Sequence, residues 1–571
     1  MPAIVIAAAV MGIFALGYRY YSSYLANRVY GLDPDFVTPA HEFADGVDYV
    51  PTNKHVLFGH HFTSVAGAAP IVGPAIAVFW GWLPALVWVT LGTVFAAGVH
   101  DFGAIIVSVR NRAQNIGTLA STVINARSRT LFLLIIFFLL TLVNAVFAIV
   151  IANLFVANPG AVIPIFFEIP LAIGLGQYIY RKRTGALVPS LAAVALLYVM
   201  IPVGSAFPIE IDGVAAALGM GPRTLWIVIL FAYAFISSRI PVWVLLQPRD
   251  YVNSHQLFIA LGIVFLGLAV GLDRIVAPAV NTDLPAGSPN WFPFLFVTIA
   301  CGAISGFHSL VSSGTTSKQL DKETDARHVG YLGALGEGSL ALGAILATTA
   351  GITAVGLNWG EQYTDFGTAS TGAVGNFVQG IAGFASHLGV PIALGTIFAA
   401  VVVISFAATT MDTGVRLQRY IIEEIGEIAG TSVFKRGLTL PTLLAVILPL
   451  ALALAPGPEG ETFAFGRLWT LFGTTNQLTA GLALAVIAVW VTRSGRNALA
   501  QLVPLVFLLF MTTWALILNL RDFWQAGDWL LLPLDLVILA LAVWLIVESV
   551  IVFGKVRRVP AELPQDEPAA P

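Results

Sequence analysis

Cysteine and charge are both scarce in this chain of 571 residues. A single cysteine, Cys301, excludes an internal disulfide framework and any multi-cysteine metal or redox motif. Only 10% of the residues are charged, whereas soluble domains contain about 25%. Hydrophobic residues make up 58% of the chain. So little charge cannot cover the surface of a water-soluble protein, and we therefore expect most of the surface to face lipid.

Motifs typical of several other protein classes are missing too. The chain has no basic patch with interleaved aromatic residues, so nucleic acid is not an expected partner. It has no GxxxxGK[ST] segment with which to use ATP. Metal ligands could in principle be gathered from His60, His61, His308, Asp101 and Glu337. However, the chain has no HExxH or comparable helical ligand pair, and we expect no metal cofactor.

The N-terminus reads as a transmembrane helix rather than a signal peptide. The run from Ala3 to Tyr20 is apolar, but no positive region precedes it and no small-residue cleavage box follows it. Its charge, Arg19, stands at the distal end. By the positive-inside rule, this predicts an N-terminus outside and the far end of the helix in the cytoplasm.

Windows of roughly 20 apolar residues, the length that a spanning helix needs, recur along the whole chain. The pattern predicts an all-α polytopic membrane protein with about fifteen transmembrane helices. The predicted spans are 2–20, 58–79, 82–110, 129–156, 160–180, 186–204, 223–246, 254–272, 290–313, 330–356, 390–412, 438–455, 468–491, 499–519 and 529–553.

Positive charge supports this count. All but four of the 28 basic residues fall in loops predicted to be cytoplasmic, Arg249 among them. The four exceptions are Arg223, Arg274, Arg467 and Arg521. One missed or invented helix would invert every later loop and destroy the pattern. We therefore expect a multi-pass protein of the cytoplasmic (inner) membrane, with an outside N-terminus and a cytoplasmic C-terminus.

Two segments outside the spans carry further predictions. Residues 357–389 form an outer loop in which Phe377, Ile381 and Phe384 recur at helical spacing, so we expect a short surface helix. The transmembrane domain is expected to fill residues 1–553. The tail 554–571 is rich in proline and glutamate and is predicted to be a disordered cytoplasmic tail.

The predicted span 58–79 is interrupted by helix-breaking residues. Proline removes helix hydrogen bonds and glycine permits unwinding. Unwound backbone at membrane depth is tolerated only against protein or a watery cavity, where its carbonyls can coordinate a cation and a half-helix N-terminus can face an anion. The alternative is a structural helix kinked by proline. The segment places His60, His61, Thr63 and Ser64 before Gly67, Pro70, Gly73 and Pro74.

A second broken helix is expected at 298–318, which holds Gly302, Gly306, His308, Ser309 and Gly314. His308 precedes Gly314 by six residues, the same spacing as His61 to Gly67. The two spans are predicted to cross the membrane in opposite senses, which suits an inverted repeat. Close helix packing is the alternative explanation for the glycine and serine residues.

Polar residues also occur in several other predicted spans. Thr409, Thr410 and Asp412 lie near the inner end of one, although threonine hydroxyls often bind only their own helix. Asn476 and Gln477 interrupt another apolar run and are expected to face the protein interior or a pore. Carboxylates within or near spans are functional candidates, and here they are Asp101, Glu168, Glu337, Asp535 and Glu548. For Asp101 and Glu337, an ion pair with a cytoplasmic arginine is the alternative to a gating role.

Four ordered stretches resemble the carbon starvation protein A family. They are FGHHFTSVAGAAPIVGPAIA at 58–77, VHDFGA at 99–104, GFHSLVSSGTTSKQL at 306–320 and LFGTTNQL at 471–478. The resemblance implies an inner-membrane transporter that takes up peptides or pyruvate during nutrient starvation and is coupled to a cation. It also implies the five-plus-five inverted-repeat core of the LeuT type.

On that core, residues 58–204 would form the first repeat and 290–491 the second, with 223–272 as an inserted helix pair. The sequence leaves open the exact solute, the coupling ion (proton or sodium) and the oligomeric state. Substrate-binding roles fall on His60, His61, Ser64, Gly67, Gly306, His308 and Ser309. Ion-coupling roles fall on Val65, Ala66, Thr409, Thr410 and Asp412, and gating or pore roles on Asp101, Glu337, Asn476 and Gln477.

Two functions from other classes remain as alternatives. One is a membrane metal-dependent hydrolase built on the histidines and carboxylates named above. The other is a starvation sensor without transport activity, which would need a folded signalling domain. The longest predicted soluble segment, 21–55, is well below ordinary domain size. The sequence therefore favours a secondary transporter in the lipid bilayer over these two alternatives.

Overall fold

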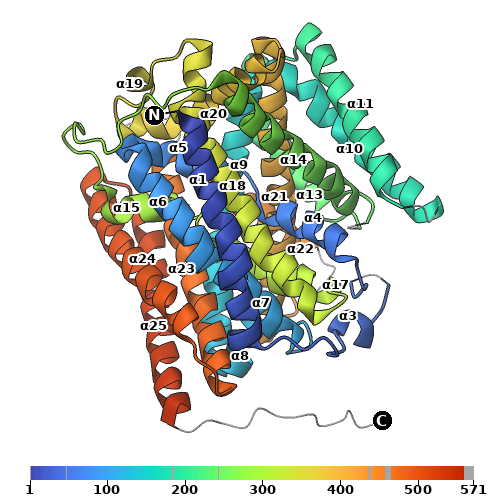
Figure 1. Ribbon diagram of the computed structural model, residues 1–571, viewed down its shortest axis with the longest axis vertical. Coiled ribbons are helices and arrows are strands. Elements are labelled where there is room, and N and C mark those ends of the chain that lie inside the picture. The colour runs from blue at the N-terminus through green and yellow to red at the C-terminus, as the bar shows by residue number, and fades with distance from the viewer. Residues whose placement is uncertain are drawn as a thin grey trace.

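The computed structural model describes residues 2–46, 48–182, 185–241, 243–434, 439–456 and 465–558. Within these ranges the chain is helical, and extended backbone pairs only in isolated bridges such as Pro2 with Arg274. The helices run mostly along one long axis (Figure 1). The all-α prediction is confirmed. The last helix continues to Arg558, five residues into the predicted tail, and the remainder of that tail lies outside the described residues.

Eleven helices are long and apolar enough to cross a membrane, and a bent pair makes a twelfth. The eleven are Ala3–Tyr30 (α1 to η2), Trp82–Val109 (α6 to α7), Ala126–Ala157 (α9), Pro159–Ile179 (η5 and α10), Leu187–Ala206 (α11), Leu246–Gly271 (α14), Glu323–Thr349 (η7 to α18), Ile392–Ile428 (α21), Phe465–Arg493 (α23), Leu499–Ala526 (α24) and Leu531–Lys555 (α25). The bent pair is α4 (Lys54–Val65) with α5 (Ala69–Ala77) and η3 (Val78–Trp80), at an angle of 49°.

Three of the fifteen predicted spans do not reach this length as single helices. Two are the shorter apolar helices α13 (Pro222–Ser237) and α22 (Thr439–Ala453). The third is broken into α15 (Trp291–Thr298), α16 (Phe307–Val311), η6 (Ser312–Thr316) and α17 (Ser317–Gln319). By length and composition, eleven or twelve helical segments among the described residues are able to cross a membrane, fewer than the fifteen that the sequence predicts.

Burial separates a central group of helices from a peripheral one. The apolar window of α23 is 100% buried by other parts of the protein, and those of η7–α18 and α9 are 89% and 78% buried. By contrast, the window of α25 is only 22% buried and those of α1 and α11 are 33% buried. Helices exposed on most of their surface need lipid around them. The central helices hold the polar residues described below.

The predicted outer loop contains a larger helix than expected. Helix α20 (Phe366–His387) has 22 residues and starts at Asp365, whose carboxylate accepts a hydrogen bond from the amide of Thr368. Phe377, Ile381 and Phe384 do share a helical face. However, all three are at most 3% exposed because α20 packs against α21, α18, α14 and α5. The prediction of a helix is confirmed, and its description as a surface helix is wrong.

Helix α14 corrects the sequence reading of Arg249. The sequence predicts a span from residue 254 and places Arg249 in a cytoplasmic loop, but the helix begins at Leu246. Arg249 is 1% exposed inside the helix bundle. A positive residue marks a cytoplasmic loop only when its charge is solvated by water, whereas the charge of Arg249 is paired with buried carboxylates.

Other basic residues from separate predicted cytoplasmic loops do meet at one end of the molecule. Arg110 donates to the carbonyl of Gly31 at 2.9 Å and pairs with Glu323 at 2.6 Å. Arg327 donates to the hydroxyl of Ser22 at 2.8 Å, and Arg496 donates to the carbonyl of Tyr30. These contacts gather around the end of the first long helix. They agree with loops lying on one side of the membrane.

Candidate functional site

The first helix break separates α4 from α5. The backbone leaves the helix at Ala66, and α5 resumes at Ala69 with Pro70 near its start. Thr410 of α21 lies against this break, because a Cβ added to Gly67 would be 2.5 Å from the Thr410 Oγ1. The break was predicted from Gly67 and Pro70, and it is confirmed.

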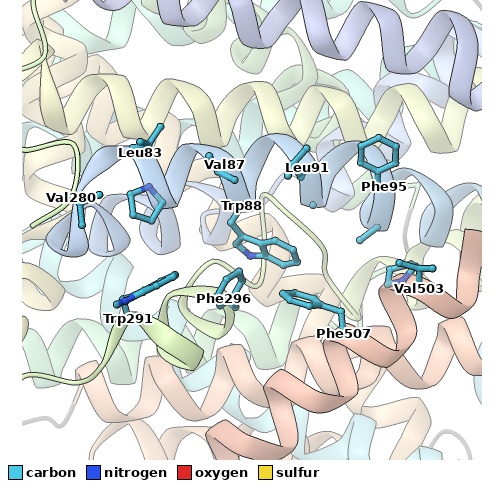
Figure 2. Close-up of a pocket in the computed structure, with 14 residues that line it drawn as sticks. Leu83, Val87, Trp88, Leu91, Phe95, Val280, Trp291, Phe296, Val503 and Phe507 are labelled. Atoms are coloured by element: carbon cyan, nitrogen blue, oxygen red, sulfur yellow. The ribbon is translucent and has the colours of Figure 1, made fainter.

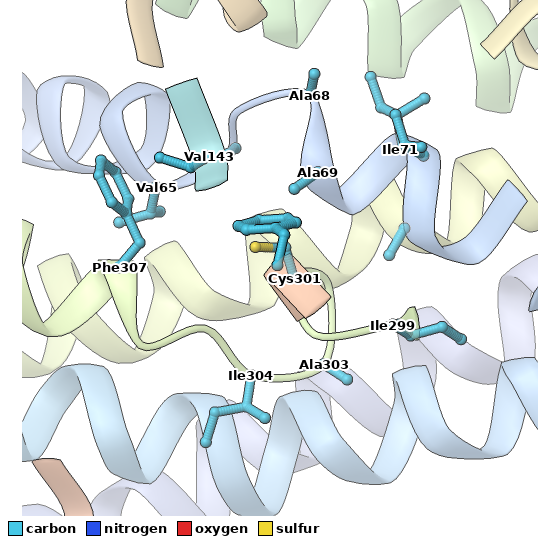
Figure 3. Packing of buried hydrophobic residues seen from close by; sticks show 14 of the residues in the cluster. Val65, Ala68, Ala69, Ile71, Val143, Ile299, Cys301, Ala303, Ile304 and Phe307 are labelled. Atoms are coloured by element: carbon cyan, nitrogen blue, oxygen red, sulfur yellow. The ribbon is translucent and has the colours of Figure 1, made fainter. Parts of the chain in front are cut away.

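The second break covers residues 299–306, between α15 and α16. Gly302 adopts a φ of +92°, which favours glycine. The two broken segments cross closely: a Cβ on Gly302 would lie 3.4 Å from the Cα of Pro70, and one on Gly73 would lie 2.4 Å from the Thr298 carbonyl oxygen. Figure 3 shows the small residues Ala68 and Ala69 beside the loop that carries Cys301. Glycine at these positions therefore allows the two backbones to touch.

The shared His-to-Gly spacing does not mark equivalent positions. Gly67 lies in the first break, whereas Gly314 lies in η6, after the second break, where an added Cβ would meet no atom within 4 Å. His61 precedes its break and His308 follows its own. The break in each segment was predicted correctly, but the six-residue match is not a structural correspondence.

His308 connects the two breaks through a buried acidic network. Its Nδ1 lies 2.9 Å from Asp101 Oδ2, and its Nε2 lies 3.3 Å from Glu337 Oε1 and 3.2 Å from the Val65 carbonyl oxygen. Glu337 Oε1 also accepts a hydrogen bond from the amide of Gly302 at 3.0 Å. These side chains and backbone groups are fully or nearly fully buried. One imidazole thus links the first break, the second break and two carboxylates.

In the described part of the chain, the two carboxylates do not form the ion pairs with cytoplasmic arginines that the sequence left as an alternative. Neither Asp101 nor Glu337 pairs with a cytoplasmic arginine among the described residues; each binds His308, and Asp101 Oδ1 also lies 2.7 Å from His100 Nδ1. With an imidazolium at His308, the two carboxylates leave one negative charge unbalanced. Glu337 Oε2 has no hydrogen-bond partner within the part of the chain that the structure describes. Binding of one more proton or cation would neutralise this remaining charge.

His61 takes part less directly. Its Nδ1 lies 2.8 Å from Thr316 Oγ1 on the second broken segment, and its Nε2 has no partner among the residues that the structure describes. Ser309 donates to the carbonyl of Gly306 in its own turn at 2.6 Å. His61 and His308 therefore lie in one buried region.

Asn476 and Gln477 of α23 hold the second break rather than line an open pore in this conformation. The Asn476 side-chain oxygen accepts from the amide of Phe307 at 3.0 Å, and its backbone oxygen accepts from the amide of Gly306 at 3.1 Å. Gln477 donates to the carbonyl of Phe296 at 3.1 Å. These bonds cap helix ends that would otherwise be unsatisfied in a buried environment.

The predicted ion-coupling residues are only partly together. Thr410 abuts Gly67, while its hydroxyl donates to the Phe406 carbonyl at 3.0 Å, the local bond that the sequence left as an alternative. Thr409 Oγ1 accepts from Asn253 Nδ2 of α14 at 2.8 Å. Asp412 is turned elsewhere, toward Arg249 at 2.7 Å. Of the three, only Thr410 is thus seen to lie against the first break.

Sequence reasoning missed the cluster around Arg249. Its guanidinium pairs with Asp412 at 2.7 Å and with Glu168 at 3.2 Å, and it also donates to the Tyr233 hydroxyl at 3.0 Å. Ser237 donates to Asp412 at 2.8 Å. Glu168 is recognisable in the sequence as an intramembrane carboxylate. A buried carboxylate needs a cation, and a search for that cation was the signal that could have found Arg249.

One face of α4 is reached from outside the protein. Val56 is 39% exposed, the side chain of His60 is 19% exposed, and Ser64 is partly exposed. These residues are four apart and therefore share a helical face. The face leads to the first break, whereas every residue of α5 is buried. Access to the break is thus from the α4 side.

A well-defined apolar groove lies elsewhere. It encloses about 650 Å³ between α6, α15 and α24, and Val87, Trp88, Leu91, Phe296 and Phe507 are among its apolar lining residues (Figure 2). With no charged side chain among the described residues of its lining, it offers nothing to bind a carboxylate. The groove is suited to hydrocarbon, and the polar residues above form the candidate site.

Comparison with known proteins places this arrangement in a family. The chain matches the family model described as "Carbon starvation protein CstA" over residues 2–364 and 351–515. The chain belongs to the carbon starvation protein CstA family. The peptide transporter CstA of Campylobacter jejuni is 33% identical over 570 residues, which cover 90% of this chain and 79% of the relative. The pyruvate/proton symporter BtsT of Escherichia coli is 31% identical over 607 residues, which cover 91% and 82%.

Membership of the CstA family sets aside the hydrolase alternative, because the family and these relatives are transporters and not enzymes. Among solved structures, a manganese transporter of Eremococcus coleocola covers 90% of this chain at 12% identity and a TM-score of 0.47. MhsT, solved with L-phenylalanine, covers 88% of this chain at 13% identity and a TM-score of 0.43.

Proposed function

We propose that this CstA family member is a secondary active transporter that takes up small carboxylate solutes, peptides or pyruvate, and is coupled to a cation. The observation that carries the proposal is the crossing of two broken helices at His308, with one buried negative charge left unbalanced. Broken helices at membrane depth are where transporters bind solutes and ions. The names of the relatives supply the solute classes. A role during nutrient starvation belongs to the same proposal and follows the family description.

The finer architecture is part of this proposal. We count α13, α22 and the broken segment 291–319 as crossings in addition to the twelve, which restores the fifteen predicted spans. Residues 58–204 and 290–491 would form two inverted repeats, and 223–272 the inserted pair. The N-terminus would lie outside the inner membrane and the C-terminus in the cytoplasm. The opposite ends of the molecule at which α1 starts and α25 ends support an odd number of crossings (Figure 1).

The solute would bind beside the first break. His60 and Ser64 lie on the accessible face of α4, and the N-terminal end of α5 follows Gly67. A helix N-terminus and an imidazole both favour a carboxylate, which pyruvate and peptides share. His61 and His308 lie deeper. His308 must leave Asp101 or Glu337 before either of its nitrogens can bind a solute.

Two cation sites fit the described residues. Sodium would be held by hydroxyl oxygens of Thr409 and Thr410 with carbonyls near Val65 and Ala66, since hard cations prefer oxygen ligands. A proton would instead bind among buried carboxylates. In the sodium case, Thr409→Ala with Thr410→Ala would abolish gradient-driven uptake and spare solute exchange at equal ion concentrations. Normal accumulation by this double variant would refute the threonine site.

The proposed function is tested by uptake into proteoliposomes. The purified protein is reconstituted, and labelled pyruvate, dipeptides and tripeptides are supplied under an imposed proton gradient, sodium gradient or neither. We expect accumulation above equilibrium for at least one solute under one gradient, and its collapse when that gradient is dissipated. Absence of gradient-driven accumulation for all three solutes would contradict the proposal.

A further inference from the structure

Helix α4 presents adjacent histidines to two different acidic networks. His61 faces the buried region of Asp101 and His308, where its Nδ1 contacts Thr316. His60 points to the other side, with its Nδ1 3.7 Å from Asp250 Oδ2. Successive residues of a helix point about 100° apart, so one turn of α4 can touch both networks. The side chain of His60 is 19% exposed at the surface of the protein, whereas His61 is fully buried.

Asp250 has an unusual environment for a carboxyl group. It is 4% exposed, Oδ1 has no hydrogen-bond partner among the described residues, and Oδ2 lies 3.7 Å from Nδ1 of His60. The neighbouring Arg249 does not neutralise it, because that guanidinium binds Glu168 and Asp412. A buried ionised carboxylate with neither a cation nor hydrogen-bond donors is strongly disfavoured.

The charges around Asp250 strengthen this argument. Arg249 is shared between Glu168 and Asp412, and the next cation, Arg416, acts on Asp412 and binds the carbonyls of Ser237 and Ile240. An ionised Asp250 would therefore have no counter-ion of its own among the described residues. Binding one proton removes that charge. The titratable and charged groups that face this region are Arg249 on α14, Glu168 on α10, Tyr233 on α13, Asp412 on α21, and His60 on α4, with His61, Asp101 and His308 beyond α4.

We propose that Asp250 is a proton-binding site of this transporter, reached from water through His60. The proton moves from water to a His60 ring nitrogen, and the other ring nitrogen delivers one to the Asp250 carboxylate; release runs in reverse. The inference rests on the proposed transport function and names its coupling ion as a proton.

The site is connected to the first helix break. Asn253, one turn after Arg249 and Asp250, donates to Thr409, and the next residue, Thr410, lies against Gly67. When Asp250 is ionised it competes with Asp412 for the Arg249 charge, and when it is protonated that competition ends. Proton binding therefore changes how firmly α14 is held to α21 at the point where α21 meets the break.

The test compares Asp250→Asn with the wild type in proteoliposomes. Asparagine keeps the shape of the side chain and cannot bind the proton. We expect the variant to lose proton-driven accumulation and solute-linked proton movement, while solute exchange without a gradient continues. The matched control is Asp273→Asn, which removes a carboxylate that also lies next to a histidine, 3.0 Å from His387, far from α4. This control should accumulate solute as the wild type does.

The outcomes separate the two proposals. Normal proton-driven accumulation by Asp250→Asn would overturn the site, as would wild-type accumulation driven by sodium without proton movement; both would leave the transport function standing. A wild type that transports none of the solutes would overturn the function itself. Should Asp250→Asn not fold, infrared difference spectra of His60→Gln and the wild type across pH decide the matter. A protonated carboxyl band that titrates in the wild type, and exchanges more slowly with deuterated water in His60→Gln, supports the site; its absence overturns it.

Discussion

The two helix breaks are built from similar residues and are held in opposite ways. Backbone groups of the second break and its flanks are bound by side chains from three other spans, namely Trp88 and Thr93, Glu337, and Asn476 with Trp469 and Gln477. Among hydrogen bonds of the described residues, the backbone of residues 65–68 receives only one from a distant side chain, that of His308.

This difference indicates which break is able to change. A buried backbone group with a fixed partner is costly to expose, at about 1–3 kcal/mol each. Several such bonds fix the second break as a scaffold. The first break has one link, small residues and an accessible approach along α4. We therefore expect the first break to move during transport. His308 contacts groups of both breaks, so this movement should change its contacts at the second break.

The largest effect is expected from the residue that joins the breaks. His308→Ala removes the group shared by Asp101 and Glu337 and should destabilise the protein by about 3–5 kcal/mol. Both carboxylates stay buried, and among the described residues Asp101 is left with only His100 and Glu337 with only the amide of Gly302. Transport should be lost, and the apparent unfolding temperature should fall. His387→Ala, at a peripheral histidine–aspartate pair, is the control. Equal unfolding temperatures and uptake in the two variants would show that His308 is not the link.

A smaller effect is expected from the scaffold. Asn476→Ala leaves the buried amide of Phe307 without its acceptor and should cost about 1–3 kcal/mol. Its neighbour Thr475 bonds to Leu471 in its own helix, so Thr475→Ala should cost less. Thermal unfolding of the two variants side by side measures the difference. Equal unfolding temperatures for Asn476→Ala and Thr475→Ala would show that the second break is not a fixed scaffold.

A substitution at the first break should change the rate of transport more than the stability of the protein. Gly67→Ala places a Cβ 2.5 Å from Thr410 Oγ1, so one of the two must shift. We expect slower uptake with a modest change in unfolding temperature. Thr410→Ala removes the opposing oxygen, and solute exchange by the double variant should recover toward the wild type. Exchange that recovers no further than in Gly67→Ala would show that this contact is not the cause.

The smallest effect is expected for Trp88→Phe. It removes one hydrogen bond to the Ile299 carbonyl, worth about 1 kcal/mol, while the ring still fills the apolar groove. The unfolding temperature should fall slightly and uptake should be retained. A loss of uptake as large as that of His308→Ala would mean that the second break also moves.

Hydropathy and helix-breaking residues were enough to predict the helical class and the position of both breaks. They could not give the partners of buried polar groups, because those come from helices far apart in the chain. For Asp101 and Glu337, a gating role and an ion pair with a cytoplasmic arginine were both left open, and the histidine that the two carboxylates share, His308, was not foreseen as their partner. Gln477 was expected to face the protein interior or a pore; it is buried in the interior, but its partner, the carbonyl of Phe296 at a helix end, could not be predicted.

Arg249 shows why one rule failed. Positive residues usually mark cytoplasmic loops, and the same rule correctly grouped Arg110, Arg327 and Arg496. Arg249 breaks it because Glu168 and Asp412 offset its burial. The sequence alone does not say that these three residues, from three helices, meet. Asp250 was overlooked for the same reason.

The most direct test of the account is thiol accessibility during transport. In a Cys301→Ala background, Ser64→Cys reports on the first break and the fully buried Ile304→Cys on the second. Each is reconstituted and exposed to a water-soluble thiol reagent with and without pyruvate or peptide. The account predicts that Ser64→Cys labels and that a transported solute changes its labelling rate, whereas Ile304→Cys stays unlabelled in both states. The opposite result, in which solute changes the labelling rate of Ile304→Cys and leaves that of Ser64→Cys unchanged, would contradict the assignment of movement to the first break.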